Sequence, residues 1–75
     1  MKIYRYQSPM GLFLIKAQPN ARWGLWFKDE LLGSYHTPVA AVDDVYTQAT
    51  GEYDWDTLEG VDIPTDVYEW EVVKR

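Results

Sequence analysis

The sequence contains one stretch that carries helix signals at both ends and helical periodicity between them: Thr37-Pro38-Val39-Ala40-Ala41-Val42-Asp43-Asp44-Val45-Tyr46-Thr47-Gln48-Ala49-Thr50-Gly51. The Thr37 hydroxyl can cap the first turn, and Pro38 suits the first helical position because the amide hydrogen it lacks would have no partner there. Gly51 can adopt the left-handed conformation that closes a last turn. The sequence therefore predicts a helix over about residues 38–50.

Apolar side chains occupy one face of this predicted helix. Counted from Pro38, they recur at helical spacing: Ala41, Val42, Val45, Tyr46 and Ala49. Most of them are small or medium-sized, which lets a helix lie close to a sheet that is rich in Trp and Phe. We expect the helix to cover one face of such a sheet.

The rest of the chain predicts strands. Short apolar and aromatic runs, separated by turn signals, lie at residues 2–7, 12–15, 23–28, 31–36 and 70–73. No Asn-Gly or Gly-X pair joins the third and fourth runs, so a four-residue loop over 28–31 is expected there. Such a loop would place Phe27 opposite Leu32. It would also place Trp26 opposite Gly33, where the indole shields the bare glycine backbone.

These elements predict an α+β fold: an antiparallel meander of three to five strands, one helix packed on one face, and an irregular acidic C-terminal segment. In that segment, Asp56-Thr57-Leu58-Glu59 has the spacing of a capping box and predicts a single turn ending at Gly60. The length predicts a single small domain, 1–75. Because the chain has no cysteine, its four Trp, six Tyr and two Phe must supply a dense core.

Charge is divided unevenly between the two halves of the chain. Residues 1–35 carry five basic side chains against two acids, a net charge of +3, whereas residues 36–75 carry ten acids against two basic side chains, a net charge of −8. One interpretation is that the acids keep an aromatic-rich protein soluble. The other is that they present an anionic surface to a basic partner, as inhibitors of nucleases do when they compete with phosphate for Arg and Lys groups.

The sequence offers no pattern typical of catalysis. His36 is the only histidine, and neither Ser8 nor Ser34 stands in a nucleophile elbow. The acidic cluster at 54–62 does not match the spacing of a calcium loop. The five glycines are isolated, so no loop is suited to cradle phosphate. We therefore expect a protein that is not an enzyme, with no catalytic residue, no cofactor and no metal site.

Aromatic and basic side chains are interleaved in the N-terminal half, a combination typical of single-strand nucleic-acid binders. The aromatic members are Tyr4, Tyr6, Trp23 and Trp26, and the basic members are Lys2, Arg5, Arg22 and Lys28. The overall negative charge opposes phosphate binding, and the same aromatics are the obvious candidates for the core. Single-stranded nucleic acid is therefore an alternative partner and not the expected one.

A sheet has two faces, and a single helix covers one of them. If Trp26 and Tyr35 lie on the open face, they form an exposed aromatic patch of the kind that marks a partner site. Together with the acidic half, this gives the candidate partner-binding residues Trp26, Tyr35, Asp43, Asp44, Asp54, Trp55 and Asp56. The leading hypothesis is a non-catalytic module that binds a larger protein through the aromatic face or the acidic surface. The alternatives are a homodimer through the aromatic face and an acidic inhibitor or nucleic-acid mimic of a phage or defence system.

Nothing in the sequence predicts membrane insertion. No apolar run approaches the roughly 20 residues that span a bilayer, and no hydrophobic region follows Met1-Lys2-Ile3-Tyr4-Arg5. The absence of cysteine is typical of proteins that do not rely on disulfides. We expect a cytoplasmic location and no membrane partner.

A series of short motifs runs along the second half of the chain: Leu32-Gly33-Ser34-Tyr35-His36-Thr37-Pro38-Val39-Ala40-Ala41-Val42-Asp43-Asp44-Val45, then Thr50-Gly51, Trp55-Asp56, Pro64-Thr65-Asp66 and Trp70. Over roughly residues 22–72, the chain resembles a group of small bacterial proteins of unknown function. The resemblance implies a bacterial origin and a stand-alone domain. It implies no activity, and it assigns no functional residue.

Overall fold

The computed structural model describes residues 2–74 of the chain. In chain order, the elements are β1 (Lys2–Ser8), β2 (Gly11–Gln18), η1 (Pro19–Ala21), β3 (Arg22–Phe27), β4 (Glu30–Tyr35), α1 (Pro38–Tyr46), α2 (Tyr53–Asp56), η2 (Val67–Glu69) and β5 (Glu71–Lys74). The symbol η marks a short 3-10 helix. Met1 and Arg75, which the predicted domain 1–75 includes, lie outside the described residues.

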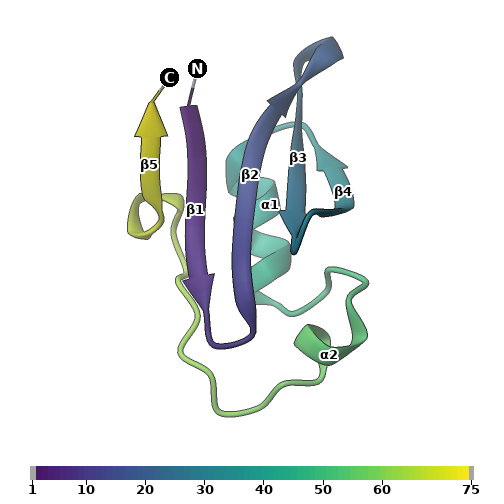
Figure 1. Cartoon of the computed structure of the whole chain (residues 1–75), viewed down its shortest axis with the longest axis vertical. Helices are drawn as coiled ribbons and strands as arrows, with labels where there is room; N and C mark the ends of the chain where they lie inside the picture. The colour runs from purple at the N-terminus through teal and green to yellow at the C-terminus, as the bar shows by residue number, and fades with distance from the viewer. Residues whose placement is uncertain (1, 75) are drawn as a thin grey trace.

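The five strands form one antiparallel sheet in the order β4-β3-β2-β1-β5 (Figure 1). β1 to β4 follow one another as a meander because short connections join each strand to the next. The chain then passes behind the sheet as α1 and returns as β5, which pairs with β1 at the edge opposite β4. The predicted α+β meander and its last strand are confirmed.

α1 packs on one face of the sheet and closes the core. Thr37 caps it as predicted, since its Oγ1 accepts a hydrogen bond from the Ala40 amide at 3.1 Å. The core combines alternate residues of β2 and β3 with side chains of α1 and of the C-terminal segment: Phe13, Ile15, Leu25, Phe27, Ala41, Val42, Val45, Trp55, Val67 and Trp70. Tyr4, Tyr6 and Trp23 pack against this core from the same sheet face.

The helix ends at Tyr46, earlier than the predicted end at residue 50. Gln48, and not Gly51, adopts the left-handed conformation that terminates it, with φ of 57°. A residue with a Cβ is strained in the left-handed conformation, and contacts of the Gln48 side chain explain why it is tolerated here. Its amide donates to the carbonyls of Trp55 and Leu58 at 2.7 and 2.6 Å, so tertiary contacts offset the strain of the backbone.

This early end divides the predicted apolar stripe. Ala41, Val42 and Val45 are buried, as the stripe predicts. Tyr46 and Ala49 are exposed, because they lie in the last turn and beyond the end of the helix, where the chain leaves the sheet. The core side of α1 is therefore made of small side chains alone, which matches the large aromatic rings that face it.

The connection between β3 and β4 differs from the expected four-residue loop. Lys28 and Asp29 form a two-residue turn with positive φ at both positions, 51° and 66°, as in a type I′ hairpin. Leu32 is an extra residue opposite β3, a β-bulge that turns its side chain towards the core. Trp26 is consequently paired with Leu31, and the predicted register is wrong.

The single turn after the helix also lies earlier than the capping-box spacing predicts. α2 spans Tyr53–Asp56, and the Glu52 side chain caps it by accepting a hydrogen bond from the Asp54 amide at 3.3 Å. Asp56 therefore ends this turn instead of starting one, and the prediction for 56–60 is wrong. The chain from there to η2 carries no regular element.

Candidate functional site

No element of the described chain covers the sheet face opposite α1 (Figure 1). Residues opposite each other in an antiparallel sheet point to the same face, so the register identifies the side chains on this one. One row across it consists of Glu71, Arg5, Leu14, Trp26 and Leu31. With the adjacent rows, the surface comprises Ile3, Arg5, Leu12, Leu14, Lys16, Trp26, Leu31, Glu71 and Val73, and we call it the open face.

Apolar side chains run across the middle of the open face. Two shallow hollows share Leu12 and Leu14 as lining residues. One hollow extends to Trp26 and encloses about 220 Å³, and the other extends to Ile3 and Val73 and encloses about 330 Å³. Contiguous apolar surface of this kind differs from the single exposed apolar residues that any soluble protein carries.

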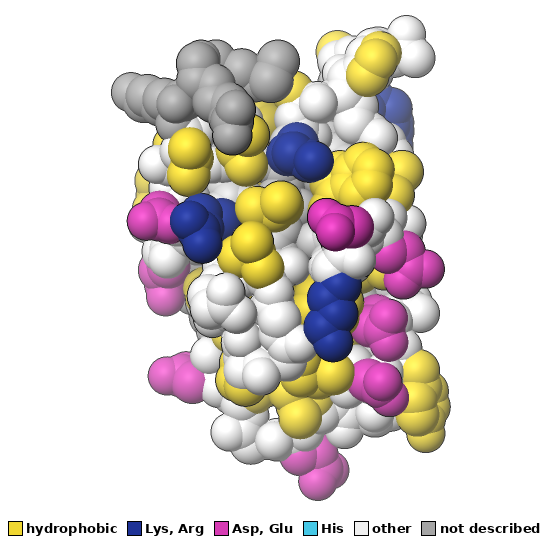
Figure 2. Space-filling view, in the orientation of Figure 1, with side chains coloured by type: hydrophobic (Ala, Val, Ile, Leu, Met, Phe, Trp, Pro, Cys, Tyr) yellow, Lys and Arg dark blue, Asp and Glu magenta, His cyan; other side chains and the backbone are white. Residues whose placement is uncertain are grey.

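Basic side chains, with acidic ones among them, border this apolar strip, as the dark-blue and magenta groups beside the yellow ones in Figure 2 illustrate. Arg5 and Lys16 line the larger hollow, and Lys28 lines the smaller one together with the acidic Asp29. Among the side chains of residues 2–73, the one ion pair closer than 4 Å joins Arg5 to Glu71, at 3.1 Å. The charges of Lys16, Lys28 and Arg22 are thus not neutralised by a described carboxylate in contact with them.

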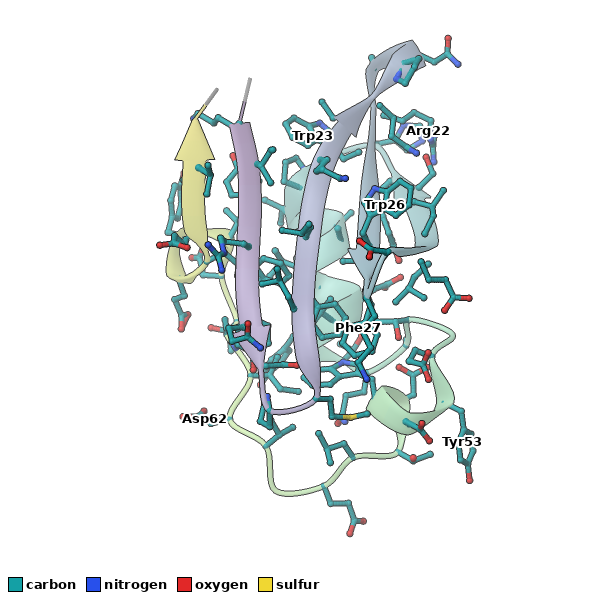
Figure 3. The ribbon with its side chains drawn as sticks, in the orientation of Figure 1. Arg22, Trp23, Trp26, Phe27, Tyr53 and Asp62 are labelled. Atoms are coloured by element: carbon teal, nitrogen blue, oxygen red, sulfur yellow. The ribbon has the colours of Figure 1, made fainter. Side chains whose placement is uncertain are left out.

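Trp26 is held in place by its neighbours on the open face (Figure 3). The Lys16 ammonium lies 4.7 Å from the centre of the Trp26 ring, a cation–π contact. A Cβ built on Gly24 would lie 3.0 Å from the indole nitrogen, so the indole shields the bare backbone of that glycine. The shielding expected at Gly33 is therefore found at Gly24, two residues before Trp26 on the same strand, where the Gln18 side chain also lies over the backbone.

Arg22 is held at one end of the same sheet face (Figure 3). Its Nε donates to Ser34 Oγ at 2.8 Å, and its Nη2 donates to the Ser34 carbonyl at 2.7 Å. The Ser34 hydroxyl donates to Gln18 at 2.9 Å, and the His36 ring lies 3.4 Å from Arg22 Nη1. Within residues 2–74, no hydrogen bond joins Ser34 to His36 as a nucleophile would be joined to its base.

The predicted partner-binding residues do not form one surface. Trp26 lies on the open face, whereas Tyr35 pairs with Trp23 and lies on the helix face. The hypothesis that Trp26 and Tyr35 form one aromatic patch is wrong, because residues 23 and 26 of one strand point to opposite faces. Asp43 is exposed on α1, and Asp54 is exposed on α2. The others, Asp44, Trp55 and Asp56, make internal contacts.

Tyr35 and Asp44 bind each other. The Tyr35 hydroxyl donates to Asp44 Oδ2 at 2.8 Å, which ties the end of β4 to α1. The pKa of Tyr35 lies well above its ordinary value, first because the phenol is partly buried and then because the Asp44 carboxylate accepts its hydrogen bond and repels a phenolate. The pair is therefore a structural link between sheet and helix.

Because of this link, the unfolding free energy is expected to depend on pH in the alkaline range, and Tyr35→Phe is expected to remove part of that dependence. Because the pKa of Tyr35 is raised by folding, its contribution to stability is complete below about pH 10, where unfolded tyrosine begins to ionise, and is lost as the pH rises further. At pH 8, Tyr35→Phe is expected to cost about 1 kcal/mol for the lost hydrogen bond. Between pH 9 and 11, its unfolding free energy, measured in urea, is expected to fall less steeply than that of the unmodified protein.

Tyr68→Phe is the matched control for this measurement, because Tyr68 is 90% exposed. It is expected to leave both the stability at pH 8 and the alkaline slope unchanged. Burial and the nearby Asp62 also raise the pKa of Tyr6, so some alkaline loss remains in the Tyr35→Phe variant. Equal alkaline slopes for Tyr35→Phe and the unmodified protein would contradict the assignment.

Trp55 and Asp56 hold the C-terminal segment on the core. Trp55 is fully buried, and its indole nitrogen donates to the Val45 carbonyl at 3.1 Å. Asp56 accepts hydrogen bonds from the Thr50 amide and hydroxyl, at 3.0 and 2.8 Å, and from the Gly51 amide at 2.9 Å. Neither side chain is presented to a partner.

The sequence interpretation missed Leu12, Leu14 and Lys16. A continuous apolar run such as 12–15 predicts a buried strand, whereas only Phe13 and Ile15 are fully buried. A run of apolar residues hides the alternation that marks a one-sided strand, so the run itself could not separate the two faces. Lys16 could have indicated the exposed face. It lies on the same side of the strand as Leu12 and Leu14, and a charged side chain at that position favours contact with water.

Within residues 2–74, no three His, Asp or Glu side chains converge at a point that could hold a metal ion. None of the helices described there has the length and apolar character needed to cross a bilayer.

No protein-family model, no curated protein and no solved structure matches the chain. The resemblance to small bacterial proteins of unknown function therefore stays a prediction.

Proposed function

We propose that the protein is a non-catalytic protein-interaction module and that the open face is its docking surface. The observation that carries this proposal is the uncovered apolar strip of Leu12, Leu14 and Trp26, bordered by basic side chains. Apolar surface left in water lowers solubility, and a partner that covers it gains the free energy of removing it from water. The strip has the mixed apolar and polar character of protein-interaction surfaces.

The partner is a protein whose own surface carries acidic groups around an apolar anchor. Lys16 and Lys28 lie beside the strip and are not paired with a described carboxylate, so partner carboxylates would meet charges that are still available. The hollows on either side of Leu14 accept apolar side chains. Trp26 is already held by Lys16 and Gly24, and a side chain fixed in advance loses little conformational freedom on binding.

Single-stranded nucleic acid suits the open face less well. Sequence-tolerant stacking uses several exposed rings along a groove. Tyr4, Tyr6 and Trp23 pack against the core on the other face, which leaves Trp26 as the ring available from that set. Titration with an oligothymidylate at low salt is therefore expected to leave the tryptophan fluorescence unchanged.

The proposal predicts a partner whose affinity depends on Trp26. A protein captured on the purified chain from its native host is identified by mass spectrometry, purified and titrated by calorimetry. Trp26→Ala is expected to weaken the affinity about tenfold or more, as truncation of a central aromatic anchor does. Lys16→Glu is expected to slow association, and more so at low salt than at high salt.

Tyr53→Ala is the matched control, because Tyr53 is an aromatic residue that projects from α2, away from the open face (Figure 3). It is expected to leave the affinity unchanged. An affinity that survives Trp26→Ala and falls with Tyr53→Ala would overturn the proposal. A dimer in sedimentation equilibrium that dissociates on Trp26→Ala would instead identify a second copy as the occupant of the open face.

A further inference from the structure

A groove on the helix side of the molecule has the opposite electrostatic character to the open face. It encloses about 500 Å³ between the first turns of α1 and residues 65–68, and we call it the α1–η2 groove. Val42 and Val67 are buried and contribute to its floor. Val39 and Tyr68 also line it and are 60% and 90% exposed. Its volume lies within the range of pockets that bind small groups and peptide side chains.

Two carboxylates line this groove, and none of its lining residues within 2–73 is basic. Asp43 lies on α1, and Asp66 lies just before η2. One oxygen of Asp66 accepts a hydrogen bond from the Tyr68 amide at 3.0 Å, which orients its carboxylate at the rim. Among the side chains of residues 2–73, no basic group lies within 4 Å of the Asp43 or Asp66 carboxylate. The groove therefore combines apolar walls with negative charge that no described cation neutralises.

We infer that the α1–η2 groove binds an arginine-bearing segment of a partner protein. An arginine side chain has an apolar stem and a charged head, so the stem can lie along Val39 and Val42 while the head reaches a carboxylate. The exposed Tyr68 ring offers a face to the same guanidinium, and such cation–π contacts favour Arg over Lys. The charge complementarity between a basic segment and Asp43 and Asp66 selects this occupant over an acidic one.

This site is separate from the open face and has a different ligand. The open face lies in front of the sheet, and its basic side chains Arg5, Lys16 and Lys28 outnumber the acidic Asp29 and Glu71. The groove lies beside α1, behind the sheet, and is lined by Asp43 and Asp66 (Figure 1). A module with two surfaces of opposite charge on opposite sides can hold two different proteins at once. The groove would bind its ligand even if the open face bound none.

Peptide titration followed by NMR tests the inference on the intact chain. The probe is the peptide acetyl-Leu-Ser-Arg-Ser-Leu-amide, and its control is the same peptide with citrulline, which keeps the shape of arginine and removes the charge. The arginine peptide is expected to shift the backbone amides of residues 39–43 and 66–68. The citrulline peptide is expected to bind more weakly, and raised salt is expected to reduce the difference.

Two pairs of variants separate the groove from general acidity. Asp43→Asn is expected to lower the affinity about threefold to fivefold, the size of one exposed ion pair, whereas Asp54→Asn, at an exposed acid on α2, leaves it unchanged. Tyr68→Ala is expected to lower it by a similar factor, whereas Tyr53→Ala does not. All four side chains are exposed, so none of these changes is expected to unfold the protein.

Three outcomes would overturn the inference. The first is the absence of any amide shift at millimolar peptide. The second is a shift map centred on residues 52–62, or equal losses from Asp43→Asn and Asp54→Asn, which would indicate attraction to the acidic segment as a whole. The third is a shift of the groove amides with protein concentration alone, which would identify a second copy as the occupant.

Discussion

Trp55→Ala is expected to remove a large part of the stability of this protein. The side chain is fully buried, its ring centre lies 4.8 Å from that of Phe13, and its indole nitrogen donates to the Val45 carbonyl. Truncation of a buried Trp typically costs about 3–5 kcal/mol. A domain of this length has a total unfolding free energy of roughly 4–11 kcal/mol. The variant is therefore expected to be partly unfolded at 25 °C, as measured by far-ultraviolet circular dichroism in urea.

Trp26→Ala is the matched control, because it truncates the same residue type on the open face. It removes a contact with Lys16 and the cover over Gly24, and it is expected to cost about 1 kcal/mol or less. Trp55→Phe retains a ring and loses the hydrogen bond to Val45, so its cost should fall between the two. A Trp55→Ala variant as stable as Trp26→Ala would show that residues 52–58 are dispensable for the fold.

Asp56→Ala is the substitution with the second largest expected effect. The Asp56 carboxylate accepts three hydrogen bonds, two of them from Thr50, whose side chain is 6% exposed. Without this acceptor, the amide and hydroxyl of Thr50 lose the group to which they donate, in a site that water hardly reaches, and the hydroxyl oxygen keeps only the bond it accepts from the Glu52 amide at 3.2 Å. Leaving buried polar groups unpaired is expected to cost about 2–3 kcal/mol in unfolding free energy, measured by urea denaturation.

Two further substitutions define what the Asp56 carboxylate contributes. Asp56→Asn keeps one carbonyl acceptor and is expected to lose about half as much stability as Asp56→Ala. Asp54→Ala removes an exposed carboxylate of the same short helix and is expected to change the stability by less than about 0.5 kcal/mol. Equal effects at 54 and 56 would mean that the loop 47–51 does not depend on this carboxylate.

These predictions reverse the roles that the sequence suggested for the acidic segment. Trp55 and Asp56 are adjacent to Asp54, and an acidic, aromatic stretch after a helix resembles an exposed recognition loop. The structure separates the three: Asp54 faces water, Trp55 enters the core, and Asp56 binds the preceding loop. Successive residues of a helical turn point in different directions, so neighbours such as these can have different surroundings. Which of them points inward depends on where the turn begins. Here the turn begins after Glu52, whose side chain caps it.

The sequence alone determined the start of the main helix, the presence of the five strands and the order of these elements. Thr37 and Pro38 act through groups that are local to the first helical turn, so the start of α1 could be predicted from them. The strands and the α+β class follow from short-range periodicity in the same way. These features depend on residues within about four positions of each other, and contacts of this kind can be predicted directly from the sequence.

The tertiary structure decided the features that depend on residues distant in the chain. The left-handed Gln48, which ends α1, is stabilised by the carbonyls of Trp55 and Leu58. The register of β3 and β4 depends on the bulge at Leu32. That register places Tyr35 on the helix face, against α1, and so separates it from Trp26 on the open face. A strand with apolar residues on both sides, such as β2, has no sequence preference for which face is exposed to water. The exposed face is decided only when another element covers the opposite one.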